Sequence, residues 1–552
     1  MTSSRALTGT GVCAGIGVGP VAHMGAPVGA LPVARAKGDP ATELARAERA
    51  LADVADELQR RCDRATGTAV AILEAQVMMA RDPALASTVA DAIGSGTPAP
   101  HAVEAAIHGF KQALEAAGGY LAERASDLDD LRNRAIARLL HLPVPGIPHR
   151  DEPFVLVAED LAPADTVDLD PARVVGLVTE RGGPTSHTAI IAKALGIPAV
   201  VSCRGALDLT EGVTVIVDGS TGALVVDPDE RELAAAGRRA DERARLLSST
   251  SGPGRTADGR SVALLLNVGR VEEATGGDVD AEGVGLFRTE FLFLDRATEP
   301  TVDEQAASYR RLFEAFGGQK VVVRTLDVGA DKPLPFVDAG PGDNPALGLR
   351  GWRLRELEPG VIDRQLQALA SAAEDAPCDV WVMAPMIATT EEAADFVSRT
   401  REVGLGTAGV MVEVPSAALQ ADRIMGVVDF VSIGSNDLSQ YTLAADRLVG
   451  ELGGLLDPWQ PAVLELMART AAAGERTGTP VGVCGEAASD PLLALVLTGF
   501  GCTSLSMSAT SLPEVRATLA GTDSATCRDL AKLALEAPSA EAARLAVMDA
   551  LS

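Results

Sequence analysis

Histidine is missing from the last two-thirds of this 552-residue chain, since all six histidines lie at or before His187. A metal site in the histidine-free part would have to use oxygen ligands, which favours Mg²⁺ or Mn²⁺ over Zn²⁺. Proton transfer there would have to use carboxylates, Lys, Tyr or Cys.

The chain also lacks any C-x-x-C pair, and its seven cysteines are scattered from Cys13 to Cys527. This distribution argues against a disulfide framework and a structural zinc site. No apolar run reaches the ~18 residues that a membrane helix needs. The N-terminal residues lead into glycines rather than into the apolar core of a signal peptide. We therefore expect no membrane insertion and a cytoplasmic location.

Basic residues are scarce, and the formal net charge is −28. Nucleic-acid binding is disfavoured because it requires basic faces. An acidic surface is commonly a solubility device, but it also suits a basic protein partner. The content of 47% hydrophobic and 22% charged residues is typical of a globular protein, and 552 residues are too many for one core. Several domains are expected.

The first 229 residues predict an α/β domain with a helical insertion at about 35–145. Apolar residues recur at helical spacing over 41–140, for example Leu44, Leu51, Val54 and Leu58. Breaks are predicted at Asp82-Pro83 and at 94–98. Buried strands with one helix between them are predicted from the apolar runs at 154–158, 174–178 and 199–201, and the stretch around 11–22 completes this unit.

A charged helix at 230–247 and a flexible joint at 248–254 form a predicted linker over 230–255. From 256 to 552, apolar runs alternate with longer amphipathic stretches in around eight strand–helix units. This pattern predicts a (β/α)8 barrel, with an open doubly wound sheet as the competing interpretation. The expected strands are 262–266, 284–287, 321–323, 380–383, 409–412, 430–433 and 481–483.

Several of these strands end at a polar or reactive residue. The residues at or just after the strand ends are Arg288, Arg324, Glu413, Asn436, Asp437 and Cys484. In a barrel they would converge at one mouth. Arginine forks suit phosphate or carboxylate oxygens, and two carboxylates can hold a divalent ion. The set predicts a site for a small, phosphorylated, highly anionic acid.

Each of these residues also has an ordinary structural explanation. A single arginine after a strand is commonly a surface ion pair, a single cysteine is commonly a small core residue, and Glu413 or Asp437 alone could cap a helix. The occurrence of such residues on successive strands favours a shared site.

His187 is predicted to lie in the first turn of a helix. Ile190, Ile191, Ala194 and Leu195 share one helical face, and Gly196 is a natural helix end. Free backbone N–H groups and the helix dipole favour phosphate at such a position and keep the imidazole neutral. His187 is therefore a candidate phosphate acceptor, although a lone histidine is commonly structural. The glycines at 9–11 match the dinucleotide pattern only weakly, and the chain has no P-loop motif.

Six motifs together resemble the phosphoenolpyruvate-utilising enzyme family. They are Gly-Gly-Pro-Thr-Ser-His-Thr at 182–188, Gly-Leu-Phe-Arg-Thr-Glu-Phe-Leu-Phe at 285–293, Arg-Thr-Leu-Asp-Val-Gly-Ala-Asp-Lys at 324–332, Met-Val-Glu-Val-Pro at 411–415, Ser-Ile-Gly-Ser-Asn-Asp-Leu-Ser-Gln-Tyr-Thr at 432–442 and Cys-Gly-Glu at 484–486. Their order and spacing are similar to Enzyme I of the bacterial phosphotransferase system, along nearly the whole chain.

The resemblance implies roles for individual residues. His187 would be phosphorylated by phosphoenolpyruvate, with Thr166 hydrogen-bonded to it, and would pass the phosphate to the carrier protein HPr. The substrate would be bound by Arg288, Arg324, Arg447, Asn436 and Asp437, with Arg350 as a further member of the substrate shell. Glu413 and Asp437 would hold Mg²⁺, and Cys484 would protonate the enolate to give pyruvate.

The resemblance also implies an HPr docking surface on the helical insertion and a homodimer formed through the barrel. The docking positions are Glu74, Met78, Met79, Asp82 and Arg124. The chain departs from the family pattern at Pro184, where many members have Arg, at Gly329-Ala330-Asp331 and in the residues after Arg447.

Two other functions compete with this interpretation of the sequence. A pyruvate phosphate dikinase or phosphoenolpyruvate synthase would need a large ATP-binding domain, which a helical block of about 100 residues cannot supply. A non-catalytic regulator that binds phosphoenolpyruvate is disfavoured because His187, Glu413, Asp437 and Cys484 are all present.

Overall fold

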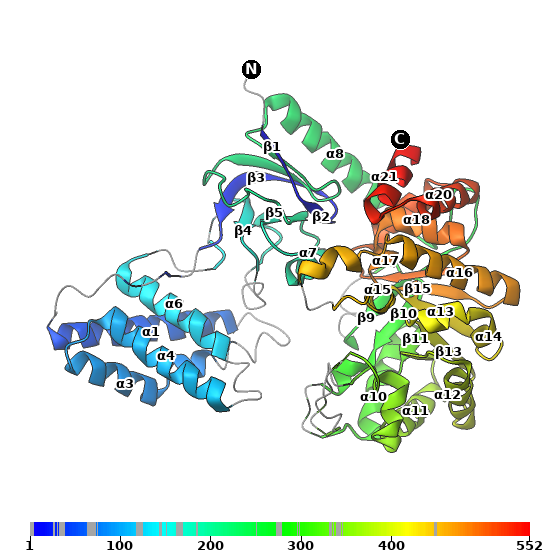
Figure 1. Ribbon diagram of the computed structural model, residues 1–552, viewed down its shortest axis with the longest axis horizontal. Helices are drawn as coiled ribbons and strands as arrows, with labels where there is room; N and C mark the ends of the chain where they lie inside the picture. The colour runs from blue at the N-terminus through cyan, green and yellow to red at the C-terminus, as the bar shows by residue number, and fades with distance from the viewer. Residues whose placement is uncertain are drawn as a thin grey trace. The chain divides into compact units, whose positions relative to one another are not determined.

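The computed structural model divides into two compact units, Met1–Arg239 and Ala240–Ser552, which are described separately (Figure 1). It describes residues 5–551 except 26–27, 30, 32–38, 63–72, 74–75, 118–124, 143–145, 149, 151, 162–168, 184–185, 250, 272–278, 295, 297, 330–333, 335, 338–343, 345 and 447–449. Within the described residues, no helix combines the length and the apolar character required to cross a membrane.

The first unit contains an eight-stranded sheet in the order β1-β8-β7-β3-β4-β5-β6-β2. β3, β4, β5 and β6 run parallel, and the remaining strands pair antiparallel. The strands are β1 Arg5–Thr8, β2 Thr10–Cys13, β3 Ile16–His23, β4 Phe154–Ala158, β5 Val174–Thr179, β6 Ala199–Val201, β7 Thr214–Asp218 and β8 Ala223–Val226. The predicted runs at 154, 174 and 199 are strands, whereas β7 and β8 were not predicted.

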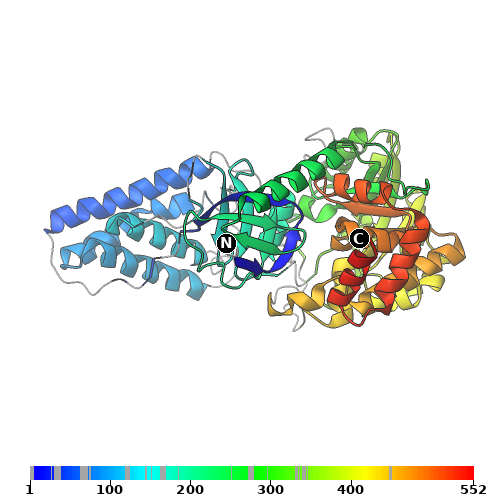
Figure 2. The same ribbon diagram turned by 90° about the horizontal axis from the view of Figure 1, so that it is seen from above.

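A helical bundle is inserted between the neighbouring parallel strands β3 and β4. Its helices pack against one another around a core that includes Leu51, Leu58, Val103 and Ile136 (Figure 2). The bounds are α1 Pro40–Cys62, α3 Pro83–Gly94, α4 Ala99–Ala117 and α6 Ala125–Leu140. The predicted breaks at Asp82-Pro83 and at 94–98 match the start of α3 and the gap before α4.

Helix α7 (His187–Leu195) connects β5 to β6. The side chain of Ser186 caps its start by accepting a hydrogen bond from the Ala189 N–H at 3.3 Å, and Gly196 ends it in the left-handed conformation with φ 68°. His187 is therefore the first residue of the helix, as predicted. Glycine suits the end because a Cβ is strained at positive φ.

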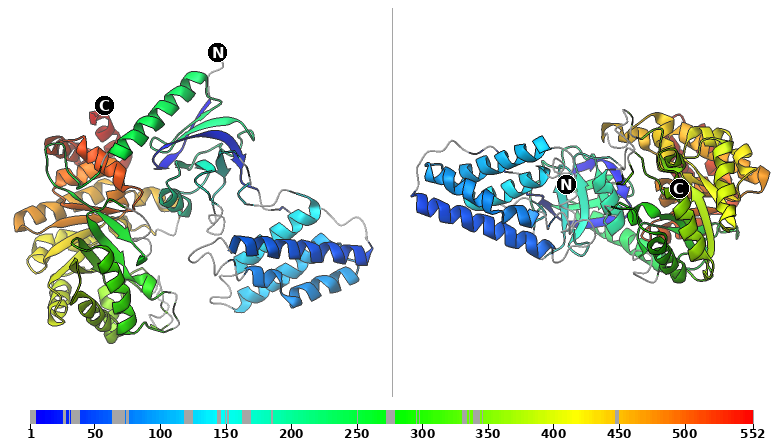
Figure 3. Two further views of the ribbon diagram at one scale, coloured as in Figure 1. Left: turned by 180° about the vertical axis from the view of Figure 1, so that it is seen from behind. Right: turned by 90° about the horizontal axis from the view of Figure 1, so that it is seen from below.

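Helix α8 (Glu230–Ser249) is one continuous helix, and the boundary between the two units falls within it (Figure 3). The prediction that a flexible joint begins at Ser248 was wrong by two residues, because the helix continues through Ser249. The wider domain boundaries predicted at 229 and 256 stay a prediction.

The second unit is a closed barrel of eight parallel strands in the order β10-β11-β12-β13-β14-β15-β16-β9. The open-sheet alternative was therefore wrong. The strands are β9 Ala263–Val268, β10 Gly283–Arg288, β11 Lys320–Arg324, β12 Asp379–Ala384, β13 Thr407–Val412, β14 Phe430–Gly434, β15 Val481–Cys484 and β16 Ser504–Met507. All are near a predicted run except β16, whose polar sequence Ser-Leu-Ser-Met shows no apolar run.

Helices surround this barrel and bury their apolar faces against its strands, in one core cluster that includes Phe287, Phe313, Phe396 and Trp459. Their bounds are α10 Val302–Ala315, α11 Pro359–Ala373, α12 Thr390–Glu402, α13 Pro415–Leu419, α14 Ala421–Met425, α15 Ser435–Leu443, α16 Pro461–Thr477, α17 Glu486–Ser489, α18 Pro491–Phe500, α19 Leu512–Ala520, α20 Ser524–Glu536 and α21 Ala540–Leu551, with 3₁₀ turns η2 Thr289–Leu292, η3 Gly351–Glu356 and η4 Gly450–Leu456. The predicted fold class, an α/β domain with a helical insertion followed by a (β/α)8 barrel, is confirmed.

Candidate active site

The residues predicted at the strand ends lie at the carboxyl end of the barrel. Arg288, Arg324 and Cys484 are the last residues of β10, β11 and β15. Glu413 directly follows β13, and Asp437 lies in the first turn of α15, directly after β14. Because all eight strands are parallel, these ends meet at one mouth, which is where (β/α)8 enzymes bind their substrates.

Two buried arginines lie in this mouth, and Asp327 binds both of them. Arg350 approaches Asp327 with two nitrogens, Nε at 2.8 Å from Oδ1 and Nη2 at 2.9 Å from Oδ2. Nη1 of Arg324 lies 3.3 Å from Oδ2 of the same carboxylate. Paired carboxylate bonds of this kind hold a guanidinium in one orientation. Asp327 therefore sets the positions of both cations.

Glu290, in the turn after β10, supports the same cluster. Its Oε1 accepts hydrogen bonds from Arg324 Nη2 at 2.9 Å and from the Asp327 N–H at 2.9 Å. Glu290, Arg324 and Asp327 are all buried, so solvent screens these interactions only weakly. Arg324 is thus held from two sides, while Arg288 is exposed at the end of its strand.

Arg350, which is predicted to belong to the substrate shell, is fully buried in this cluster. Its Nη1 is 3.2 Å from Asp437 Oδ1 and donates to the Tyr441 hydroxyl at 3.0 Å. Its contacts show that it orients Asp327 and Asp437. Its membership of the substrate shell stays a prediction.

Glu413 has one oxygen in use and one without a partner. Oε1 accepts a hydrogen bond from the Met386 N–H at 2.6 Å. Oε2 accepts none within the described part of the chain, although the residue is fully buried. A Cβ added to Gly434 would lie 2.7 Å from Oε2, so glycine at this position keeps the space beside that oxygen open. A buried carboxylate oxygen beside open space is suited to a cation.

The buried charges at the mouth do not balance. Among the described residues of the mouth, four buried carboxylates face two buried guanidiniums. The carboxylates are Glu290, Asp327, Glu413 and Asp437, and the guanidiniums are those of Arg324 and Arg350. Burial, together with the charges of Asp437 and Asp327, raises the pKa of Glu413 to about 8. With Glu413 ionised, these described groups carry an excess of two negative charges, which is the complement of one divalent cation.

No group of three or more His, Cys, Asp or Glu residues surrounds a single metal position within the described residues. Glu413 and Asp437 would therefore have to share an ion with water and substrate oxygens. Mg²⁺ accepts this arrangement because it keeps several waters and needs only one or two carboxylates.

Asn436 is exposed beside Asp437, in the first turn of α15. Its Oδ1 accepts hydrogen bonds from the Glu486 N–H at 3.0 Å and from the Ser435 hydroxyl at 3.3 Å. With its oxygen engaged, the amide N–H groups are the part available to a ligand.

Cys484 is buried within the barrel, and the Ser432 hydroxyl donates a hydrogen bond to its sulfur at 3.1 Å. Burial raises the pKa of the Cys484 thiol to about 11. A thiol with this pKa carries its proton at neutral pH, which suits a proton donor.

The predicted phosphate acceptor lies on the first unit. His187 begins α7, but nothing is described of its side chain. The next residue, Thr188, is buried, and its hydroxyl donates to Asp160 Oδ1 at 2.7 Å. That bond ties the first turn of α7 to the end of β4. Backbone N–H groups at the start of a helix can donate hydrogen bonds to an anion.

Several predicted positions lie outside the described residues: Glu74, Arg124, Thr166, Pro184, Ala330, Asp331 and Arg447. Of the other predicted docking positions, Met78 is 72% exposed, Met79 packs partly against the bundle core, and Asp82 caps α3 by accepting a bond from the Ala84 N–H at 2.8 Å.

Glu290, Asp327, Tyr441 and Ser432 were not singled out from the sequence. Each lies within one of the family motifs, no more than five positions from a predicted site residue. Their position within those motifs was the available signal, but their contacts depend on the folded barrel.

Models of three parts of one enzyme family match this chain. They are the PEP-utilising enzyme N-terminal region at residues 8–124, the mobile domain at 150–222 and the PEP-binding domain at 243–524. The mobile-domain match contains His187, and the PEP-binding match contains the barrel mouth.

Curated relatives are similar along the whole chain. A phosphoenolpyruvate-protein phosphotransferase of Streptomyces coelicolor is 52% identical over 550 residues, covering 99% of each chain. One of Haloferax volcanii is 43% identical and covers 92% of each chain, and one of Staphylococcus carnosus is 36% identical and covers 85% of each. The chain therefore belongs to the phosphoenolpyruvate-utilising enzyme family, among the phosphoenolpyruvate-protein phosphotransferases.

Proposed function

We propose that this chain transfers phosphate from phosphoenolpyruvate to its own His187 and then to the carrier protein HPr, and that it releases pyruvate as the first step of phosphotransferase-system sugar uptake. The buried cluster at the barrel mouth carries this proposal. Fixed arginines, and an excess of carboxylates over guanidiniums among the described buried groups, suit a phosphorylated acid that arrives with a divalent cation.

Arg324 and Arg288 bind the anionic groups of the substrate in this proposal. Arg324 is pre-oriented by Glu290 and Asp327, so little ordering free energy is lost on binding. Arg288 is exposed at the rim, and the N–H groups of Asn436 complete the set. Arg447 is a further proposed contact.

Glu413 and Asp437 are the proposed Mg²⁺ ligands. When bound, Mg²⁺ supplies positive charge that offsets the charge of the substrate and of the two carboxylates. Arg350 keeps Asp437 in place from below.

Cys484 is the proposed acid. Its thiol protonates the substrate carbon once the phosphoryl group has left, and its pKa of about 11 keeps the proton in place until then. His187 is the proposed nucleophile, and α8 belongs to the proposed linker that lets the histidine domain serve both the barrel mouth and HPr.

Three further properties are part of the proposal: HPr docks on the helical bundle, the barrel forms a homodimer, and the protein resides in the cytoplasm. The acidic composition supports a basic partner, and the exposed Met78 supplies an adaptable apolar contact.

The test is pyruvate release measured together with HPr phosphorylation. Purified protein mixed with phosphoenolpyruvate, Mg²⁺ and HPr should form one phospho-HPr for each pyruvate. Pyruvate release that continues without HPr beyond one molecule per subunit would contradict a protein as the final acceptor.

A further inference from the structure

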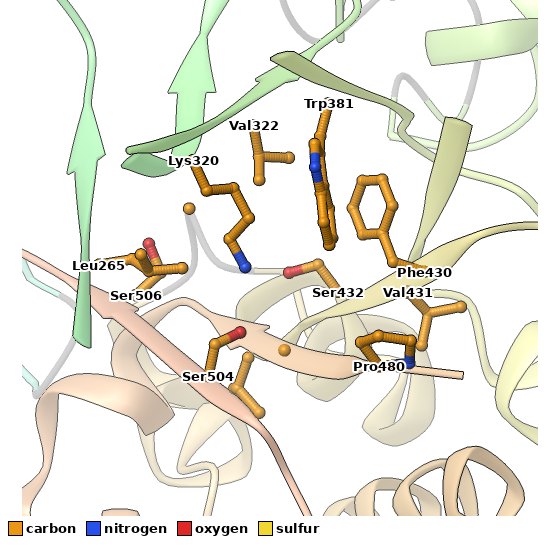
Figure 4. A pocket seen from close by; sticks show the side chains of 13 residues that line it. Leu265, Lys320, Val322, Trp381, Phe430, Val431, Ser432, Pro480, Ser504 and Ser506 are labelled. Atoms are coloured by element: carbon orange, nitrogen blue, oxygen red, sulfur yellow. The ribbon is translucent and has the colours of Figure 1, made fainter. Parts of the chain in front are cut away.

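A cavity lies inside the barrel below Cys484, on the side opposite the mouth. Its volume is about 20 Å³, and it is partly open to solvent. Lys320, Trp381, Ser432, Gly482, Ser504 and Ser506 are among the residues that line it. Figure 4 shows the Lys320 ammonium and the hydroxyls of Ser432 and Ser504 directed into this one space.

The cavity exists because this part of the barrel interior carries small and polar residues. Barrel interiors of this fold are ordinarily filled by bulky branched side chains. Here β16 contributes Ser504 and Ser506, β15 contributes Gly482, and β14 contributes Ser432. A Cβ at Gly482 would lie 2.7 Å from Ser504 Oγ, so even alanine would crowd this hydroxyl.

The cavity connects solvent to the buried interior. Lys320 is the first residue of β11 and is partly exposed, as are Trp381 and Gly482. Ser504 and Ser432, farther inside, are buried. The lining combines apolar side chains with hydroxyl groups and an ammonium. A cavity of this volume has room for about one water molecule, which these polar groups can hold in place.

Ser432 joins this cavity to the proposed acid. Its hydroxyl lines the cavity and also donates a hydrogen bond to Cys484 Sγ at 3.1 Å. Cys484 itself is only 2% exposed. Ser432 is therefore the contact between the thiol and the water-accessible space.

We infer that Ser432 and this cavity form the path by which solvent returns a proton to Cys484 after each turnover, an inference that rests on the proposed function. Cys484 gives its S–H proton to the enolate carbon, so an S–H bond breaks and a C–H bond forms. The thiolate then takes the Ser432 O–H proton. Ser432 takes a proton from a cavity water, and that water recovers one from solvent.

The residues around the cavity support proton delivery to Cys484 from the cavity side. Substrate or product fills the mouth above Cys484 during the reaction, so the cavity side is the open side. The Lys320 ammonium lies 4.6 Å from the centre of the Trp381 ring at the outer end. Burial lowers the pKa of Lys320, although Asp379 and Glu282 oppose this, and a lowered pKa makes the ammonium a readier proton donor to cavity water.

Ser432→Ala tests the inference, because it separates the first turnover from later ones. Without HPr, each subunit can release one pyruvate using the proton already on Cys484. We expect the rate of that first release to stay within about twofold of the unmodified protein. With excess HPr, every later turnover needs a new proton, and we expect a fall of at least tenfold, in line with the usual contribution of proton transfer groups.

Ser398→Ala is the matched control, since Ser398 lies on the exposed surface of α12 and its hydroxyl donates to Glu402 at 3.1 Å. It should change neither rate. Ser504→Val leaves the Ser432–Cys484 contact in place but fills the cavity, and should reproduce the slow later turnovers. This second variant keeps the test decisive if Ser432→Ala folds poorly.

Equal falls in the first and later turnovers would show that Ser432 only positions the thiol, and the inference would be overturned. Unchanged rates in both variants would overturn it too. If the unmodified protein released no pyruvate at all, the proposed function would fail, which is a separate result.

Discussion

Asp327 holds Arg350 with both carboxylate oxygens, at 2.8 Å from Nε and 2.9 Å from Nη2. Both side chains are fully buried. Arg350 also contacts Asp437, a proposed Mg²⁺ ligand. Asp327 in addition pairs with Arg324, which is proposed to bind the substrate. One carboxylate therefore connects the cation side of the mouth with the anion side.

Asp327→Asn should destabilise the barrel and weaken substrate binding. Removing one partner of a buried ion pair leaves the other charge unpaired, at a cost of about 3–5 kcal/mol. All three tryptophans of the chain, Trp352, Trp381 and Trp459, lie in the second unit, so tryptophan fluorescence during denaturation reports on the barrel alone.

Asp422→Asn is the control for that measurement. Asp422 pairs with Arg476 at 2.9 Å, but both side chains are more than half exposed. Solvent screens such a pair, and its loss should leave the transition nearly unchanged. Similar transitions for Asp327→Asn and Asp422→Asn would contradict the importance assigned to the buried cluster.

Gly434→Ala should weaken Mg²⁺ binding without removing any carboxylate. The new Cβ would lie 2.7 Å from Glu413 Oε2 and 2.8 Å from the Met411 methyl carbon, in the space proposed for the ion. Gly434 has φ −88°, which alanine adopts readily, so the backbone need not be strained. Calorimetric Mg²⁺ titration in the presence of oxalate should show at least tenfold weaker binding.

Glu413→Gln should weaken Mg²⁺ binding in the same titration, whereas Glu402→Gln on the exposed end of α12 should not. Unchanged Mg²⁺ affinity in both Gly434→Ala and Glu413→Gln would place the cation elsewhere.

Cys484 should resist alkylation until strongly alkaline pH. Its pKa of about 11 means that only about one thiol in a thousand is ionised at pH 8, and the thiolate is the reactive form. Because the folded-state pKa lies above the unfolded value, the stability contributed by this thiol is complete below about pH 8.5 and is lost as the pH rises towards 11.

The measurement is iodoacetamide labelling followed by peptide mass analysis at pH 8 and pH 10. The partly exposed Cys62 provides an internal comparison. Labelling of Cys484 as fast as Cys62 at pH 8 would show that the thiol is neither buried nor protonated as described.

Met78→Asp should slow phosphate transfer to HPr by about tenfold, because an exposed apolar contact is replaced by a charge at the proposed docking surface. Phosphorylation of the protein itself by phosphoenolpyruvate should be unaffected, since the substitution lies in the helical bundle. Rapid-quench measurement of both steps separates them, and equal slowing of the two would indicate a folding defect instead.

Strand positions in the barrel could be predicted where strands are buried on both faces and read as apolar runs, as β10 and β11 do. β16 could not be predicted, because Ser504 and Ser506 face a polar cavity. The two serines that make β16 hard to predict from the sequence also line the cavity of the inferred proton path.

The candidate site could be predicted from the sequence only in part. Parallel strands place their last residues together, so Arg324, Glu413 and Cys484 could be grouped from sequence. The contacts of Arg350 with Asp327 and Asp437 depend on how a long loop returns to the barrel, and no local pattern encodes that.

Phosphorylation of His187 tests the central claim most directly. The protein should be incubated with radiolabelled phosphoenolpyruvate and Mg²⁺, and its intact mass and acid-labile label measured. We predict one acid-labile phosphate per subunit on the unmodified chain and none on His187→Ala. Acid-labile labelling that persists in His187→Ala would contradict the account, since another residue would then be the acceptor.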